Sequence, residues 1–193
     1  SGVSSTRSGA TQNPLVESRH VLVGSQSMLI TRLTKVTMCF ALGLFCLLVA
    51  FDNVSHPDTN YTFVQHVLSM DTTFPENGLK YRAITNPIAW QAAYAAIIVA
   101  EGFAGLLFVA GAMRLLRVRN APAADFNREK GYAVAGGALA FLIWFFGFTV
   151  VGGEWFAMWE SKIWNGQETA FRFYITAVAV LIFLNQPDGE ISE

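Results

Sequence analysis

The sequence predicts an all-α, polytopic membrane protein with four transmembrane helices and a short amphipathic helix in the first outer loop. Two observations predict this fold. Only 14% of the 193 residues are charged and 53% are hydrophobic, whereas about 25% are charged in a typical soluble domain. Four separate apolar stretches approach or exceed the length of about 20 helical residues that crosses a bilayer core. A soluble globule with so few charges could not cover its surface, so lipid is the expected solvent.

The four predicted spans define a membrane domain over residues 28–186 with a tail on either side. The spans are expected at residues 29–51, 88–116, 131–159 and 168–185. Residues 1–27, rich in Ser, Thr, Gly and Gln, are predicted to form a flexible cytoplasmic tail. Residues 187–193 are predicted to form an acidic cytoplasmic tail, and residues 52–87 form the largest outer loop.

The distribution of Lys and Arg predicts that both termini are cytoplasmic. Nine of the 13 basic residues fall in the segment up to Lys35 or in the loop between the second and third spans. The other two loops hold the remaining four, and loops rich in Lys and Arg stay on the cytoplasmic side. Four Trp side chains fall at the opposite boundary, where amphipathic rings are favoured. They are Trp90, Trp155, Trp159 and Trp164.

A short amphipathic helix is predicted in the outer loop at residues 61–70. Tyr61, Val64 and Leu68 fall on one helical face, and polar side chains occupy the other. Asn60 is placed to cap the start of this helix. We expect the helix to lie on the outer membrane surface or across the helix bundle.

No cofactor is predicted, although the chain can bind lipid. A transmembrane b-type haem needs His ligands on facing helices, and His20, His56 and His66 all lie outside the predicted spans. The chain lacks a Gly-rich phosphate loop, a Cys-x-x-Cys pair and a His-Glu-x-x-His motif, so no metal site is expected. A net charge of -1 leaves no basic field for nucleic acid. The expected partners are lipids and other integral membrane subunits.

Glu101 is the ionisable residue near the centre of a predicted span, and it has two interpretations. An acid at this depth costs about 2.5–3.5 kcal/mol to insert, so it should face protein or water and have a partner. One interpretation is a proton or cation relay. The other is a protonated acid that is hydrogen-bonded across a helix interface. The second is favoured, because one acid without a second intramembrane charge makes a poor transport path.

Five more polar residues on the outer side are candidate functional or packing residues. They are Asp52, His56, His66, Asp71 and Glu154. Together with Asn53 and Asp58, the first two offer oxygen and nitrogen ligands at a spacing that suits a metal, but a polar turn after a span has the same pattern. Glu154, close to the outer end of the third span, fits a cation site or a set of interfacial carboxylates. The solvated interpretation is favoured for all five.

Small residues on the second and third spans form a candidate ridge for helix docking. Alanine recurs every four residues in the second span, and the third span carries a pair of adjacent glycines. Small side chains let helices approach closely, either inside the bundle or with the helix of a partner. The ridge consists of Ala92, Ala96, Ala100, Gly105, Gly136 and Gly137.

Three segments on the outer side carry a family resemblance. They are Phe51-Asp52-Asn53, the stretch FVQHVLSMDTTFP at residues 63–75, and GEWFAMW at residues 153–159. With these segments the chain resembles a bacterial family of uncharacterised "predicted small integral membrane proteins" over nearly all of its length after the N-terminal tail. The resemblance implies a four-helix protein of the bacterial inner membrane, and it implies no established activity.

Two functions from different classes are expected. The first is a non-catalytic accessory or structural subunit of a larger complex, and by analogy a respiratory or photosynthetic electron-transfer assembly is a natural host. The second is a small homo-oligomeric transporter or channel that uses Glu101, although the two halves of the chain show no convincing repeat. An enzyme acting on lipid or quinone at the outer face is least favoured, because no nucleophile and base can be paired.

Overall fold

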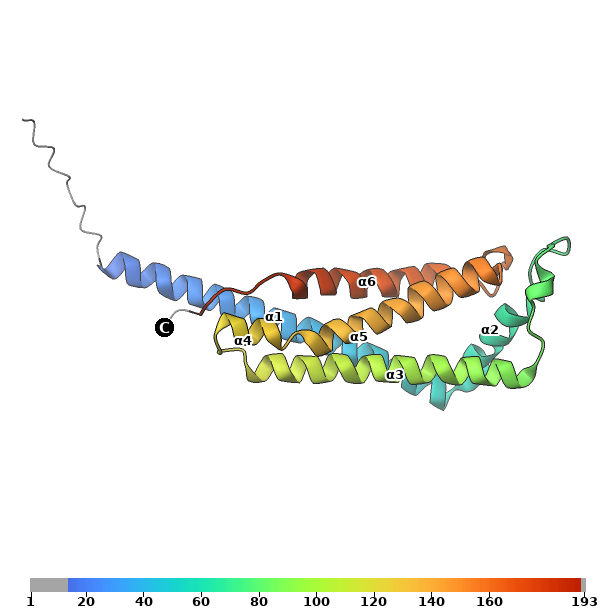
Figure 1. Ribbon diagram of the computed structural model, residues 1–193, viewed down its shortest axis with the longest axis horizontal. Coiled ribbons are helices and arrows are strands. Elements are labelled where there is room, and N and C mark those ends of the chain that lie inside the picture. Colours follow the sequence, from blue (N-terminus) through green and yellow to red (C-terminus); the bar gives the residue numbers. More distant parts are fainter. Residues whose placement is uncertain (1–13, 192–193) are drawn as a thin grey trace, which may run out of the picture.

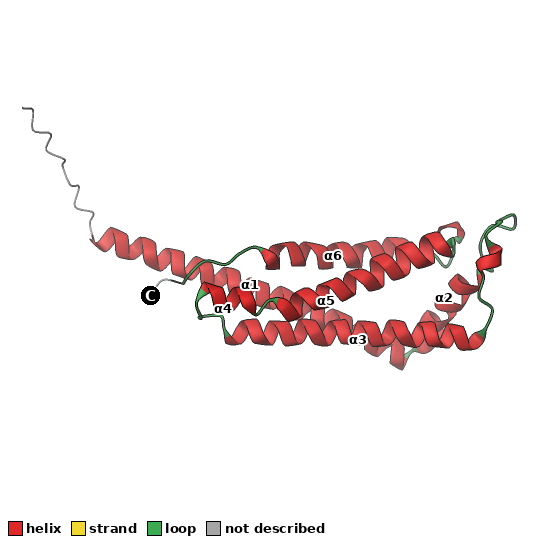
Figure 2. Ribbon diagram, in the orientation of Figure 1, coloured by secondary structure: helices red, strands yellow, loops and turns green. Residues whose placement is uncertain are grey.

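The structure is a computed structural model that describes residues 14–191, with side chains from Gly24 onward. Long helices joined by short turns form one bundle, and the described range contains no β-strand (Figure 2). The elements are α1 (Pro14–Ser55), α2 (Pro57–Ser69), η1 (Lys80–Arg82), α3 (Pro87–Arg117), α4 (Ala123–Arg128), α5 (Gly131–Phe141), η2 (Leu142–Trp155), η3 (Met158–Glu160) and α6 (Gln167–Asn185).

Four segments of the described chain are long and apolar enough to cross a membrane, which confirms the predicted all-α, four-span fold. They are Gly24–Ser55, Pro87–Arg117, Ala123–Trp155 and Gln167–Asn185. Large apolar side chains such as Leu48, Val99 and Ile182 are exposed on these helices. Lipid is the solvent that suits such a surface.

Helix α1 begins at Pro14, so residues 14–27 are helical where a flexible tail was expected. Proline suits the first turn of a helix, because the N–H that it lacks would have no partner there. A helix that already spans a membrane can also be extended at little cost, because each added residue gains a hydrogen bond and no new helix has to be nucleated. The N-terminal part of α1 therefore projects beyond the other long helices (Figure 1). Residues 1–13 of the predicted tail lie outside the described residues.

The third span is a composite rod in which α5 continues directly into the π-helix η2. The π-type pattern is seen at its end, where the Phe156 N–H donates to the Val151 carbonyl at 3.0 Å. The rod ends at Trp155 and not at residue 159 as predicted. The reason is that Ala157 adopts a left-handed conformation with φ 50°, which turns the chain into η3.

The four long helices are arranged so that α3 lies between α1 and α5, while α6 packs against η2, α5 and α1. Glycine makes the contacts between α3 and its neighbours very close. A Cβ atom on Gly43 of α1 would lie 2.7 Å from Val109 Cγ2 and 3.1 Å from the Gly105 carbonyl oxygen. A Cβ atom on Gly111 of α3 would lie 2.6 Å from the Ala133 nitrogen. Contact of this kind is how small residues drive helix association in membranes.

The predicted outer helix is present as α2 and lies at the end of the bundle where α3 begins (Figure 1). We call this the α2 end, and the opposite end, where the chain leaves α6, the terminal end. An apolar cluster joins α2 to the segment that follows η2. It consists of Val67, Met70, Phe156, Ala157 and Met158. Asn60 does not cap the helix as predicted, because α2 begins earlier, at Pro57, with His56 at its N-cap position.

A buried ion cluster holds the segment after α6 against the terminal end. The Asp188 Oδ2 atom lies 2.7 Å from Lys35 Nζ and 2.6 Å from Lys130 Nζ, and all three side chains are buried. The Gln186 carbonyl accepts a further hydrogen bond from each ammonium group. Asp188 therefore anchors the segment after α6, predicted as an acidic tail, to Lys35 of α1 and to Lys130 at the N-cap of α5, while Pro187, Gly189 and Glu190 remain exposed.

Arg32 reinforces the same region. Its guanidinium is fully buried and donates hydrogen bonds to the backbone carbonyls of Arg119, Ala121 and Gly189, at 2.6–2.9 Å. The guanidinium carbon also lies 4.7 Å from the centroid of the Phe126 ring. One side chain of α1 thus ties the loop after α3 and the segment after α6 to the same point.

Candidate functional site around Glu101

Glu101 is buried within the bundle at the middle of α3 (Pro87–Arg117), with 2% of its surface exposed. It lies on α3, and its Oε2 atom accepts a hydrogen bond of 2.8 Å from Nδ2 of Asn53 on α1. Asn53 is itself buried. The partner that an intramembrane acid requires is therefore a neutral amide on the neighbouring helix. This arrangement fits the interpretation of Glu101 as an acid that is hydrogen-bonded across a helix interface.

Two more hydrogen bonds fix Asn53 in place. Asn60 Nδ2 of α2 donates to Asn53 Oδ1 at 2.5 Å, and the buried Tyr94 hydroxyl of α3 donates to the Asn53 carbonyl at 2.7 Å. The side chain of Asn53 thus receives one hydrogen bond and donates another. This network connects α1, α2 and α3, and it holds the Glu101 carboxyl group in a defined orientation.

A cavity of about 480 Å³ lies beside this network and is lined by Glu101, Asn53 and Asn60. We call it the Glu101 cavity. Six aromatic side chains are among the residues that line it. They are Phe63, Tyr94, Trp144, Phe148, Trp164 and Phe173. The cavity also reaches exposed polar residues of the α2 end, which are Asp52, Thr59, Asn165 and Thr169. It therefore leads from a polar mouth to a buried acid.

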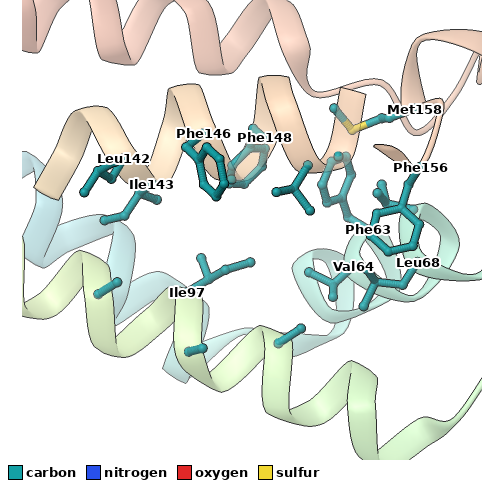
Figure 3. Close-up of a pocket in the computed structure, with 17 residues that line it drawn as sticks. Phe63, Val64, Leu68, Ile97, Leu142, Ile143, Phe146, Phe148, Phe156 and Met158 are labelled. Atoms are coloured by element: carbon teal, nitrogen blue, oxygen red, sulfur yellow. The ribbon is translucent and has the colours of Figure 1, made fainter. Parts of the chain in front are cut away.

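A second hollow, of about 390 Å³, lies between α2, α3 and the rod formed by α5 and η2 (Figure 3). All the residues that line it are apolar or glycine, so we call it the apolar groove. Leu142 and Phe146 come from η2, Ile97 from α3, and Leu68 from α2 (Figure 3). The groove and the Glu101 cavity share the side chains of Phe63, Val64, Ile97 and Phe148.

The other predicted polar candidates are divided among several places. Asp52 lies at the mouth of the Glu101 cavity, whereas His56 and Glu154 are exposed and do not line it. His66 and Asp71 form a pair of their own, with 2.8 Å between Nδ1 and Oδ2. Within residues 14–191, as far as their side chains are described, no three His, Cys, Asp or Glu residues are grouped so as to hold a metal ion.

The predicted docking ridge is split between the interior and the surface. Gly105 is buried against α1, where an added Cβ would lie 2.7 Å from Leu47 Cγ, and Gly136 and Gly137 are buried against α3 and α6. Ala92 and Ala96 are exposed and Ala100 is half-buried, and both Ala96 and Ala100 line the apolar groove, which Ala92 does not. A bulky residue at position 105 will therefore disrupt the bundle itself, and only the alanines nearest the α2 end remain open to a partner.

Sequence reasoning missed the residues that complete the site. Asn53 was considered only as one of four residues whose spacing suits a metal ion, and Asn60 only as the cap of the outer helix. Tyr94 was recognisable from spacing, because it precedes Glu101 by two helical turns and faces the same side of α3. Nothing in the sequence pairs Asn53 with Glu101, because that contact depends on how α1 and α3 are rotated against each other.

The fold and this buried site define a polytopic α-helical membrane protein with a polar cavity between its helices. A family model described as "Predicted small integral membrane protein (DUF2165)" matches residues 31–187. The chain therefore belongs to this family, and the match covers the first span from residue 31 onward, the other three spans in full, and the Glu101 network. Comparison with curated proteins and with solved structures gives no match.

Replacing Asn53 with alanine is expected to destabilise the α2 end, whereas Glu101→Gln is expected to leave stability almost unchanged. The first change removes the donor to a buried carboxyl, and an unsatisfied buried polar group costs about 1–3 kcal/mol. The second keeps a side-chain oxygen that accepts the Asn53 hydrogen bond. Thermal unfolding of the purified chain in detergent, followed by circular dichroism, measures both.

Asn120→Ala, at an exposed position between α3 and α4, is the matched control and should unfold like the wild type. Equal destabilisation by Asn53→Ala and Asn120→Ala would show that the Asn53 network contributes nothing to the bundle.

Proposed function

We propose that the chain is a non-catalytic accessory or structural subunit of a larger bacterial inner-membrane complex. The observation that carries this proposal is the exposed half of the alanine ridge on α3. Ala92 and Ala96 lie one turn apart, exposed in the membrane-spanning part of the helix, so another helix can approach the backbone closely. On the same helix Gly105 already receives α1 in this way.

The hydrogen bond between Glu101 and Asn53 supports a structural role for the buried acid within such a subunit. Both termini are proposed to face the cytoplasm, because the terminal end carries most of the Lys and Arg residues. An electron-transfer assembly, respiratory or photosynthetic, remains the proposed host by analogy alone. The apolar groove is proposed to hold a lipid chain, since its lining offers only apolar surface.

A second candidate function is transport by a small homo-oligomer, and the Glu101 cavity favours it. The cavity connects exposed residues at the α2 end with an intramembrane acid, which is the arrangement expected at one end of an ion pathway.

The stoichiometry of the protein in native membranes separates the two functions. Gentle detergent extraction, a sizing column and mass spectrometry should find the chain at fixed stoichiometry within a large complex. Migration alone or as a small homo-oligomer would instead favour transport.

The accessory role predicts that Ala92→Leu, a change at an exposed residue that does not line the apolar groove, releases the chain from its complex without unfolding it. The larger side chain holds the partner helix away, at a cost of about 1–3 kcal/mol to association. Ala138→Leu, at an exposed position on α5, is the matched control. Co-purification that survives Ala92→Leu, with equal melting temperatures for the wild type and both variants, would exclude this part of α3 as the docking surface.

A further inference from the structure

We propose that the Glu101 cavity binds a small organic cation, a quaternary or protonated alkylamine, with Glu101 as its counter-ion. This inference does not depend on the accessory role, because the cavity lies inside a single chain.

The first argument is the state of the Glu101 carboxyl group. The side chain lines the cavity, and only its Oε2 atom has a hydrogen-bond donor among the described residues. No Lys, Arg or His is found among the described residues that line the cavity. When ionised, the carboxylate therefore lacks a charge partner among the described residues that line the cavity, and a cation in the cavity supplies one.

The second argument is the composition of the walls. The six aromatic side chains named above line the space, and aromatic faces attract cations, most strongly when these are desolvated. A small inorganic cation instead needs a shell of several oxygen atoms. The alkyl groups of an organic ammonium ion make apolar contact with the aromatic rings, and its positive charge is attracted by the faces of the same rings. The walls therefore favour an organic cation.

The third argument is the charge of the mouth. Asp52 lies there with hydroxyl and amide side chains of Thr59, Asn165 and Thr169, so the entrance attracts cations and repels anions. The absence of basic residues from the described lining also leaves nothing to bind a phosphate. An amine without a phosphate group therefore fits the cavity better than the head group of a phospholipid.

Isothermal titration calorimetry tests the proposal on the purified full chain in a maltoside detergent. Choline is the probe, and 3,3-dimethylbutan-1-ol is its neutral isostere. We expect choline to bind with one site per chain. The isostere should bind at least about tenfold more weakly, because it lacks the positive charge that interacts with Glu101. Equal binding of the two compounds, or no binding of choline, would overturn the proposal.

Variants then locate the site. Glu101→Gln should weaken choline binding by about tenfold or more while its elution volume and melting temperature stay those of the wild type. Trp164→Leu removes one aromatic ring from the cavity lining, at a position outside the membrane spans, and should weaken choline binding by a few fold. Glu154→Gln removes an exposed carboxylate that does not line the cavity and should change nothing. Wild-type affinity in Glu101→Gln would overturn the proposal.

A short-chain phosphatidylcholine, added below its critical micelle concentration, distinguishes a free amine from a lipid head group. We expect it to leave the choline titration unchanged. Displacement of choline by this lipid would overturn the assignment of a cation without phosphate.

Discussion

Gly111→Ala is expected to destabilise the bundle strongly, by forcing α3 away from α5. An added Cβ would lie 2.6 Å from the Ala133 nitrogen, 2.8 Å from its Cβ and 2.9 Å from its Cα. Two of these atoms belong to the backbone, so no side-chain rotation can relieve the contact. Overpacking in a well-packed core costs about 1–3 kcal/mol, and we expect the upper part of this range. The melting temperature in detergent, followed by circular dichroism, measures the effect.

Gly102→Ala is the matched control for this prediction, since it makes the same change nine positions earlier on α3. A Cβ there meets only Ala50 Cβ at 3.9 Å, an ordinary contact. Alanine also has the higher helix propensity, by about 1 kcal/mol in soluble helices. Gly102→Ala should therefore unfold at the wild-type temperature or slightly above it. If the two variants unfold at the same temperature, the close contact between α3 and α5 does not limit stability.

The number and class of the helices were predictable because a span is a local property of the sequence. Each requires about 20 residues with few charges, and the described structure has four such segments. The helix boundaries were less predictable. α1 continues to Pro14 through polar residues. The third span ends at Trp155, two residues before Ala157, whose left-handed conformation has no sequence signal because it is not glycine.

The candidate site was predictable only in its central residue. An acid such as Glu101 must find a partner in a membrane, and this necessity can be read from one position. The partner itself, Asn53, is fixed by the rotation of α1 against α3, and Asn60 reaches it only because α2 folds back at the α2 end. The aromatic walls come from five different parts of the chain, so no local pattern could assemble them.

Asp188→Asn is expected to have the largest effect of any single change at the terminal end. The carboxylate of Asp188 faces Lys35 and Lys130 at 2.7 and 2.6 Å, in a place where all three side chains are buried. Removing one partner of a buried ion pair costs about 3–5 kcal/mol, because a buried charge is left without compensation. Here two ammonium groups lose their carboxylate at once. We expect a lower melting temperature and proteolysis within residues 186–191.

Glu190→Gln is the control, because Glu190 is exposed and only two residues away on the same segment. The Glu190 Oε2 atom accepts a hydrogen bond of 2.9 Å from the Ala123 N–H, and the amide oxygen of Gln can accept it as well. Its change should leave both the melting temperature and the proteolytic pattern as in the wild type, since exposed charges contribute little. A Glu190→Gln variant as unstable as Asp188→Asn would mean that the segment is held by its surface charges and not by the buried cluster.

Adding Lys35→Met to Asp188→Asn tests whether the loss of stability is electrostatic. In the double variant Lys35→Met with Asp188→Asn, a single ammonium group remains, and the Asn127 Oδ1 atom and the Gln186 carbonyl still accept hydrogen bonds from Lys130. The double variant should therefore be more stable than Asp188→Asn alone, which is a favourable coupling in a double-mutant cycle. Strictly additive losses would show that Asp188 acts through packing. A positive coupling would identify charge neutralisation as the interaction that joins α1, α5 and the segment after α6.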